Sequence, residues 1–352
     1  MKKLILPLVL VSSFSQAHTV LASDSAPVRR ALIIGLDGTT GAQLQEQTLN
    51  GGAPAIRQLM KDGKFASCAD AEDPHCARAH SGPKAGDGFR WLTGPGWASV
   101  LTGVDNSKTL LKNNDPKSLE IFAQTSREYP TFLMRLRHEL NYKVSAGGVG
   151  AFMTSSNHGE LDPGVLDFEC GLQADEVTLK TAAETSSCNL NVRHAGDGKD
   201  PQRDQKLAAW IKTQIADPET RLVMGVFDQI DAEGHRHGFG SNKNYLQAIS
   251  NADVLVGQLV AAVKHRVQHN HEEWLIITTS DHGGHDVFIF GNHGTREFKD
   301  SAVPFIVTTY GENIPPLRDL ESPVSHMDTH PTVMQWFGRP SLNADGKIQA
   351  LP

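Results

Sequence analysis

The chain has 352 residues, a formal net charge of −7 and 39% hydrophobic residues. This length can bury a large core as one α/β domain, and the acidic balance excludes the uniform basic footprint of a nucleic-acid-binding protein. A small anionic substrate is not excluded, because bound metal ions would reverse the charge locally.

The N-terminus has the pattern of an export signal. Residues 1–3 are a short basic start, residues 4–10 are apolar with one proline, and residues 20–22 are small or apolar. We therefore expect a secretory signal peptide over residues 1–22, which is too short to span a membrane. Residues 23–352 contain no other long apolar run, so we expect an exported protein, periplasmic or secreted, with no transmembrane segment in its mature part.

All four cysteines lie in the mature part, and an even number in an exported protein favours disulfides. Four cysteines allow three pairings. The local pairs Cys68–Cys76 and Cys170–Cys188 are favoured because each closes a short loop.

The first predicted strand covers residues 30–36 and ends at Asp37 and Gly38. A short amphipathic helix is expected over residues 54–64. A carboxylate at a strand end is often only a helix cap or a turn residue, so Asp37 alone indicates little.

Residues 93–103 read TGPGWASVLTG. Thr93 precedes a Gly-Pro turn that opens a short helix, and the free N–H groups of a helix N-terminus suit a phosphate oxyanion. The alternative is that Thr93 is a simple N-cap.

The middle of the chain contains its least regular part. We expect a helix over residues 129–140, a strand over 142–148 and a helix over 205–215. Residues 151–203 are polar and contain proline and glycine, which favours an irregular insertion near the site, as a lid or specificity loop.

The strand predicted over residues 221–227 leads into DQIDAEGHRHG, residues 228–238, which we interpret as one short turn rich in carboxylates and imidazoles. Asp231 and His235 lie four residues apart in it, and Gly234 permits the bend. Such clusters also arise by chance on surfaces.

A long helix follows over residues 244–267, with apolar residues at alternating spacings of four and three. The next strand carries the apolar run 274–277 and ends in Thr-Thr-Ser, followed by Asp281, His282 and two glycines. An unbroken apolar run is typical of a strand buried on both faces. His293 lies eleven residues beyond His282.

The C-terminal part adds a strand over residues 302–307 and a capped helix within 325–338, in which no metal role is expected for His326 and His330. Strands and helices alternate throughout, which predicts an α/β fold with a mostly parallel central sheet and helices on both faces. In such a sheet, ligands bind at the carboxyl ends of the strands.

Six potential metal ligands follow predicted strands or lie in adjacent turns: Asp37, Asp231, His235, Asp281, His282 and His293. Six ligands are too many for one tetrahedral metal and suit two divalent ions, most simply Zn²⁺. Such a pair stabilises the attacking and leaving oxygens of a phosphoryl displacement, and Thr93 can supply the nucleophile.

The order of these motifs resembles the alkaline phosphatase superfamily, and most closely its type I phosphodiesterase/nucleotide pyrophosphatase branch in bacterial secreted form. The matching stretches are LIIGLDG, TGPGWASVLTG, DAEGHRHG, TTSDHGG, NHG and MDTHPTVMQWFG. The resemblance runs from about Ala31 to Gly338, leaves residues 151–203 unmatched, and implies a three-layer sandwich.

The resemblance also implies roles for individual residues. One metal would be held by Asp37, Asp281 and His282 and bridged by Thr93, and the second by Asp231, His235 and His293. Thr93 would attack phosphorus and form a phospho-threonine that water then hydrolyses. The Gly94 N–H would bind a phosphoryl oxygen of a small phosphate ester, and Asn114 is a loose match to a further phosphate contact.

Several departures leave alternatives open. The branch usually has Asn three residues after the nucleophile, where this chain has Gly96. The cysteine and arginine of a sulfatase motif are missing around Thr93, and no counterpart of the phosphatase arginine is evident, which favours diesters over monoesters. A phosphomonoesterase, a phosphonate hydrolase and a non-catalytic binding protein on the same fold are the alternatives.

Overall fold

The structure is a computed structural model that describes residues 26–80, 91–114, 125, 128–148, 168–171, 202–295, 297–341 and 343–352. The predicted signal peptide, nearly all of the predicted insertion and Cys188 lie outside the described residues. The Cys170–Cys188 pairing therefore stays a prediction, whereas the Cys68–Cys76 disulfide is present.

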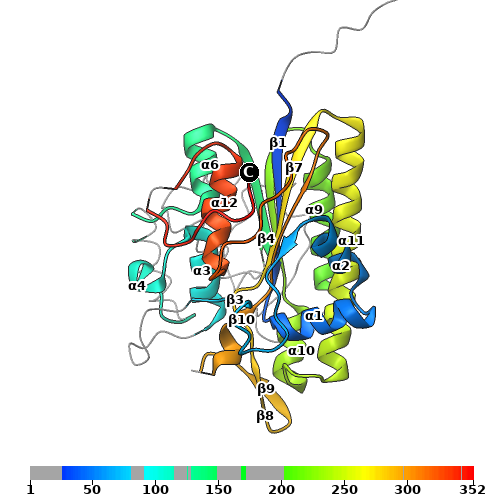
Figure 1. The fold of residues 1–352 in the computed structure, drawn as a ribbon, viewed down its shortest axis with the longest axis vertical. Coiled ribbons are helices and arrows are strands. Elements are labelled where there is room, and N and C mark those ends of the chain that lie inside the picture. The colour runs from blue at the N-terminus through cyan, green and yellow to red at the C-terminus, as the bar shows by residue number, and fades with distance from the viewer. Residues whose placement is uncertain are drawn as a thin grey trace, which may run out of the picture.

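A seven-stranded, mostly parallel sheet forms the centre of the molecule (Figure 1). Its strands, in spatial order, are β2 (Lys64–Phe65), β11 (Phe305–Tyr310), β7 (Glu272–Thr279), β1 (Val28–Leu36), β6 (Thr220–Phe227), β4 (Lys143–Gly148) and β5 (Phe168–Gly171). The neighbours of β1 run parallel to it, and β11 is antiparallel to both of its neighbours. The carboxyl ends of β1, β6 and β7 therefore meet at one edge.

Alternate residues of each central strand enter opposite cores, as the two-residue period of a strand requires. In β1, Ala31 and Ile33 face one core, and Leu32, Ile34 and Leu36 face the other. Both cores are fully buried, which explains why the sequence shows unbroken apolar runs in these strands.

Helices cover both faces of the sheet, as predicted (Figure 1). The first core is closed by α3 (Thr93–Thr102), α6 (Phe132–Leu140) and α12 (Thr329–Trp336). The second core is closed by α1 (Gly41–Asn50), α2 (Pro54–Asp62), α9 (Arg203–Ala216), α10 (Gln229–His237) and α11 (Lys243–His269).

Helix α11 is the one helix among the described residues that is long and apolar enough to cross a membrane. Its apolar stripe, including Tyr245, Ile249 and Val256, is buried against the sheet. A core helix that covers a sheet has this composition, so the finding does not indicate a membrane span.

The prediction of a turn after β6 is wrong, because Gln229–His237 form the helix α10. Gly234 weakened the helical signal, yet its missing side chain is what lets Phe239 pack against the helix. The predicted strand over residues 302–307 is interrupted at Pro304 into β10 (Ala302–Val303) and the start of β11.

Several short elements were not predicted. They are the helices α1 and α4 (Asn106–Thr109), the strands β2 and β5, the strand β3 (Ala77–Arg78), which pairs with β10, and the hairpin of β8 (His285–Val287) and β9 (Phe290–Asn292). The hairpin lies beyond the carboxyl ends of the central strands, beside α10 (Figure 1).

Candidate active site

The carboxyl ends of three neighbouring parallel strands bring six acidic and imidazole side chains together. Asp37 follows β1, Asp281 and His282 follow β7, and Asp231 and His235 lie on α10, which starts directly after β6. His293 comes directly after the second strand of the β8–β9 hairpin. These six residues form two groups whose potential ligand atoms lie within 4.8 Å of one another.

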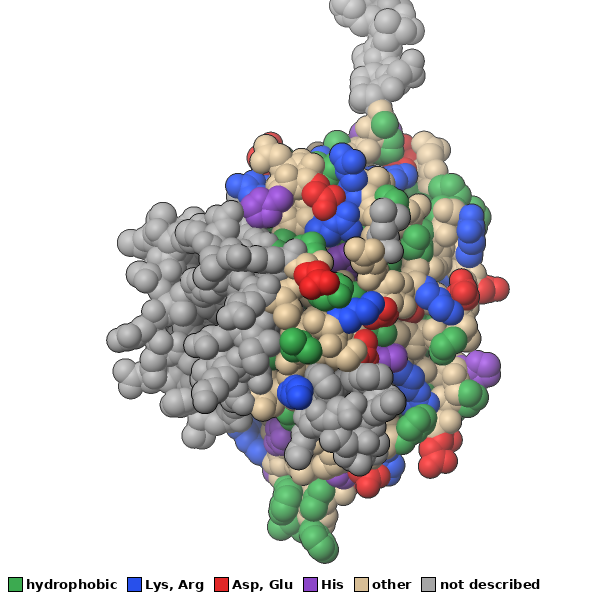
Figure 2. Space-filling view, turned by 90° about the vertical axis from the view of Figure 1, so that its left-hand side faces the viewer, with side chains coloured by type: hydrophobic (Ala, Val, Ile, Leu, Met, Phe, Trp, Pro, Cys, Tyr) green, Lys and Arg blue, Asp and Glu red, His purple; other side chains and the backbone are tan. Residues whose placement is uncertain are grey.

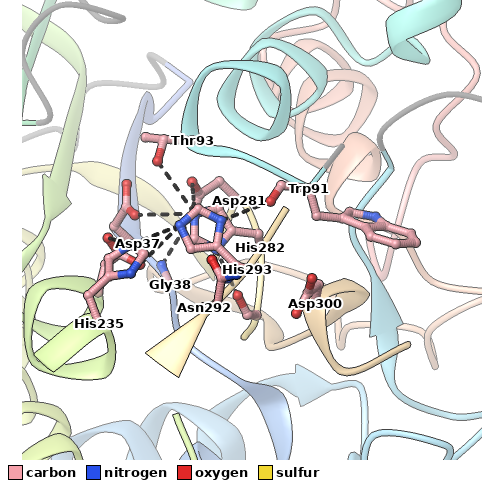
Figure 3. Close-up of polar contacts among 12 residues, drawn as sticks. Asp37, Gly38, Trp91, Thr93, His235, Asp281, His282, Asn292, His293 and Asp300 are labelled. Atoms are coloured by element: carbon pink, nitrogen blue, oxygen red, sulfur yellow. Dashed lines mark hydrogen bonds and ion pairs between the residues drawn. The ribbon is translucent and has the colours of Figure 1, made fainter. Parts of the chain in front are cut away.

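The first group consists of Asp37, Asp281 and His282, and all three are completely buried. His282 Nε2 lies 3.3 Å from Asp281 Oδ2 and 3.7 Å from Asp37 Oδ1 (Figure 3). The other oxygen of each carboxylate is already used. Trp97 Nε1–H donates to Asp37 Oδ2 at 2.9 Å, and the Gly38 N–H donates to Asp281 Oδ1 at 3.2 Å.

The proton on the His282 ring is placed by its backbone partner. Nδ1 lies 2.8 Å from the Gly283 carbonyl oxygen, which can only accept, so Nδ1 carries the hydrogen and Nε2 presents a lone pair. That lone pair faces two carboxylate oxygens and lies 3.4 Å from the Thr93 hydroxyl. Acceptors directed at one point are the arrangement that a bound cation requires.

The second group consists of Asp231, His235 and His293. The i,i+4 spacing on α10 puts Asp231 and His235 on one face, with His235 Nε2 3.4 Å from Asp231 Oδ2. His293 approaches from the hairpin, its Nε2 3.0 Å from His235 Nε2 and 3.8 Å from Asp231 Oδ1. Its Nδ1–H donates to the Trp91 carbonyl oxygen at 2.9 Å, which again leaves Nε2 as the free donor atom.

The two groups are directly adjacent. The rings of His282 and His293 lie over one another (Figure 3). Their centroids are 3.7 Å apart and the interplanar angle is 17°. The side chain of His235 is 40% exposed, whereas those of Asp37, Asp281 and His282 are inaccessible to solvent. The site therefore opens to solvent at the second group and is closed at the first.

The electrostatics of the site fit bound cations. Asp37 Oδ1, Asp231 Oδ1 and Asp281 Oδ2 are buried and have no hydrogen-bond partner among the described residues. Burial, together with repulsion from neighbouring carboxylates, raises the pKa of Asp37 and Asp281 well above the usual range. Burial lowers the pKa of His282 and His293, so both rings are neutral at pH 7 and can act as ligands. Uncompensated carboxylates beside neutral imidazoles are a donor set for divalent metals.

Thr93 is the first residue of α3 and Leu92 holds the N-cap position, so the N-cap interpretation of Thr93 does not apply. Its hydroxyl points toward His282, a member of the first group of potential metal ligands (Figure 3). The Gly94 N–H, which we expected to face a phosphoryl oxygen, donates to Asn114 Oδ1 at 2.7 Å. Asn114 is therefore brought to the entrance of the site, next to Thr93.

Two further residues at the site were missed in the sequence. The Trp97 Nε1–H donates to Asp37 Oδ2 and orients that carboxylate. Trp97 lies four residues after Thr93 on α3, but the sequence alone does not show that this helix packs beside Asp37. Asp228 follows β6 as Asp37 follows β1 and lies within reach of Asp37 and Asp231, but it forms a buried ion pair with Arg203. The Arg203 guanidinium compensates the charge of Asp228, whereas Asp37, Asp231 and Asp281 each keep an oxygen without a hydrogen-bond partner among the described residues.

His326 and His330 each contact backbone groups of neighbouring segments. His326 accepts a hydrogen bond from the His80 N–H at 2.9 Å and lies 3.2 Å from the Ser280 carbonyl oxygen. His330 Nδ1–H donates to the Leu101 carbonyl oxygen at 2.7 Å and so joins α12 to α3.

Comparison with known proteins places these motifs in a family. The family model described as type I phosphodiesterase / nucleotide pyrophosphatase matches residues 31–302. This range includes most of β1, Thr93 and all six residues of the two groups. No curated protein matches the chain.

Solved structures share the fold at low sequence identity. Murine ectonucleotide pyrophosphatase / phosphodiesterase 5, an inactive variant in complex with AMP, matches with a TM-score of 0.56 and 14% identity over 91% of this chain and 97% of its own. The lipoteichoic acid synthase LtaP from Listeria monocytogenes matches with a TM-score of 0.56 and 13% identity, over 92% of this chain and 75% of its own. A protein in the alkaline phosphatase superfamily from Vibrio parahaemolyticus matches with a TM-score of 0.56 and 15% identity, over 93% of this chain and 71% of its own.

Proposed function

The chain belongs to the type I phosphodiesterase / nucleotide pyrophosphatase family and is a phosphoric ester hydrolase, and from this premise we propose that it cleaves phosphate diesters or pyrophosphate bonds through a phospho-Thr93 intermediate. The observation that carries the proposal is the position of the Thr93 hydroxyl. It lies at a helix N-terminus, 3.4 Å from the lone pair of His282 Nε2, beside two groups of metal-ligating side chains.

Two divalent ions, which we propose to be zinc, fit the side chains of the site. Asp37, Asp281 and His282 would hold one, and Asp231, His235 and His293 the other. When bound, they would supply Lewis-acid stabilisation of phosphoryl oxygens and favour the alkoxide form of a nearby hydroxyl. Carboxylate oxygens and imidazole nitrogens are the ligands that zinc accepts in catalytic sites, which supports this choice.

Different residues of the chain have different roles in the proposed displacement. Thr93 Oγ1 attacks phosphorus, the bond to the leaving alcohol or phosphate breaks, and the phosphoryl group is carried on Thr93 until water releases it. The N–H groups at the start of α3 bind phosphoryl oxygens, and Asn114 exchanges its bond with Gly94 for a contact with substrate. His282 stays neutral, held by the Gly283 carbonyl oxygen, throughout.

We also propose that the protein is exported, with residues 1–22 as the signal peptide. The Cys68–Cys76 disulfide supports this proposal, because disulfides form and persist in oxidising compartments such as the periplasm. Mass spectrometry of the protein isolated from its producing cells would find a mature N-terminus near residue 23. An uncleaved N-terminus would contradict the proposal.

The substrate preference is tested with two chromogenic esters. Turnover of bis-p-nitrophenyl phosphate is compared with that of p-nitrophenyl phosphate on the mature chain with zinc present. The proposal predicts faster hydrolysis of the diester. Faster hydrolysis of the monoester would instead make the protein a phosphomonoesterase of the same fold.

A further inference from the structure

The β8–β9 hairpin ends in an exposed apolar tip formed by Phe288, Ile289 and Phe290, which we call the hairpin tip. Phe288 is 97% exposed, Ile289 86% and Phe290 48%. Figure 2 shows hydrophobic side chains projecting from the lower end of the molecule, where Figure 1 places this hairpin. No residue from Val287 to Gly291 carries a charge. Exposed apolar clusters of this kind mark interaction sites.

The backbone of the hairpin tip is held in an unfavourable conformation. Phe288 has a φ of +56°, a region that bulky L-residues rarely adopt and that glycine or asparagine adopts at little cost. The turn thus presents an aromatic side chain to solvent where a small residue would suit the backbone better. An aromatic residue at this position is therefore better explained by a role for its exposed ring than by the requirements of the turn.

The base of the hairpin packs against the elements of the candidate active site. Gly291 packs so closely on α10 that a Cβ there would lie 2.2 Å from the Gly234 carbonyl oxygen. At the other strand, His285 Nδ1 lies 2.6 Å from Asp300 Oδ1. His293, one of the candidate metal ligands, follows directly after β9. The base of the hairpin is therefore packed against the site, and the tip projects from the open side of the site.

We propose that the hairpin tip inserts into a lipid bilayer and places the site at the level of the head groups. At a rise of about 3.3 Å per residue, the two steps of β9 from Asn292 to Phe290 span about 7 Å, and the turn residues Phe288 and Ile289 lie beyond them. Interfacial apolar side chains enter the boundary between head groups and acyl chains by about 5–10 Å. The site would then lie a few ångströms above that boundary, where the phosphodiesters of membrane lipids are found.

The size and chemistry of the tip favour a lipid surface over a protein partner. Its three side chains offer roughly 400 Å², about half of the 800 Å² that each partner contributes to a stable protein interface. The tip is a narrow projection without charged groups, and the chain is acidic overall. These features suit a zwitterionic bilayer and do not provide the cationic cluster that anionic lipids require.

The test is co-sedimentation of the mature protein with phosphatidylcholine vesicles. The tip variant combines Phe288→Ser with Ile289→Ser, and the control combines Leu49→Ser with Val254→Ser, two exposed apolar side chains on α1 and α11. Wild type and control should sediment with vesicles, and the bound fraction of the tip variant should fall at least tenfold. All three should hydrolyse soluble bis-p-nitrophenyl phosphate at rates within twofold of each other.

Wild-type protein that stays in the supernatant, or a tip variant that binds as well as wild type, would overturn the proposal. So would a wild-type dimer in light scattering that the tip variant loses, because the tip would then join two copies of the chain. The head-group part of the inference rests on the proposed diester chemistry. If none of the three proteins hydrolysed the soluble diester, the proposed function would fail. The sedimentation result would still show independently whether the hairpin tip binds a membrane.

Discussion

At the scale of single residues, the site depends on which atom of each ligand is left free. Trp97 and Gly38 each occupy one carboxylate oxygen, and the Gly283 and Trp91 carbonyl oxygens fix the protonated nitrogens of two imidazoles. The atoms that remain converge on two points. The sequence pointed to these six side chains as candidate ligands, because their residue types follow strand ends. Their hydrogen-bond partners come from distant segments and have no local signal.

Substituting Trp97 by Phe tests this orientation. The variant keeps a buried aromatic ring and loses the N–H that holds Asp37 Oδ2, so zinc affinity should weaken by about 10–100-fold. The measurement is zinc competition against a chelator of known affinity. Trp274→Phe is the matched control, because this buried indole donates to Glu272 at the opposite end of β7. Equal zinc affinity in wild type and Trp97→Phe would show that the hydrogen bond does not orient Asp37.

At the scale of secondary structure, the docking of α3 against the end of β7 sets the position of Thr93, the proposed nucleophile. A Cβ at Gly96 would lie 2.5 Å from the Asp281 carbonyl oxygen and 2.7 Å from Asp281 Cβ. This close approach explains why glycine stands where related phosphodiesterases are expected to have asparagine. The long elements were predictable from periodicity. Helix α10 was not predicted from the sequence. The i,i+4 spacing of Asp231 and His235 is compatible with a helix, but Gly234 and the surrounding polar residues favoured a turn.

Substituting Gly96 by Ala tests the docking of α3. Alanine favours a helix interior by about 1 kcal/mol over glycine, but here it must push α3 away from Asp281 and with it Thr93 from His282. We expect at least a tenfold loss of diester turnover without loss of helix content by circular dichroism. Gly257→Ala on α11, where the added Cβ meets only Ala55 at 3.2 Å, should leave turnover near wild type. Wild-type turnover in Gly96→Ala would refute the close-contact argument.

At the scale of the whole molecule, sheet topology assembles the site. Parallel pairing of β1 with β6 and β7 brings Asp37, Asp231 and Asp281 to one edge although the chain separates the first and last by 244 residues. The alternation of strands and helices predicted this edge. It could not predict the small pairings β10–β3 and β8–β9, because two- and three-residue strands have no periodicity to detect.

Buried His330 predicts how global stability depends on pH. Burial lowers its pKa to about 4 in the folded state from 6.5, so between pH 6.5 and 4 the unfolded chain binds a proton that the folded chain does not. This difference lowers the free energy of unfolding as pH falls across that window, by up to about 3 kcal/mol. His330→Gln can still donate to Leu101 and does not titrate, so its stability should fall less.

Urea unfolding at pH 7, 5.5 and 4.5 measures this difference between wild type and His330→Gln, with His75→Gln at an exposed position as the control. Loss of metal at low pH affects all three proteins equally and cancels in the comparison. Parallel stability curves for wild type and His330→Gln would contradict the assignment.

The central claim is that Thr93 is the nucleophile beside two metal ions, and the most direct measurement pairs turnover of bis-p-nitrophenyl phosphate with zinc content in Thr93→Ala. We predict that the variant binds as much zinc as wild type and loses at least ~1,000-fold in turnover. Thr93→Ser, which keeps a hydroxyl, should retain a measurable part of the rate. Wild-type turnover in Thr93→Ala would show that another group attacks phosphorus and that the proposed intermediate does not form.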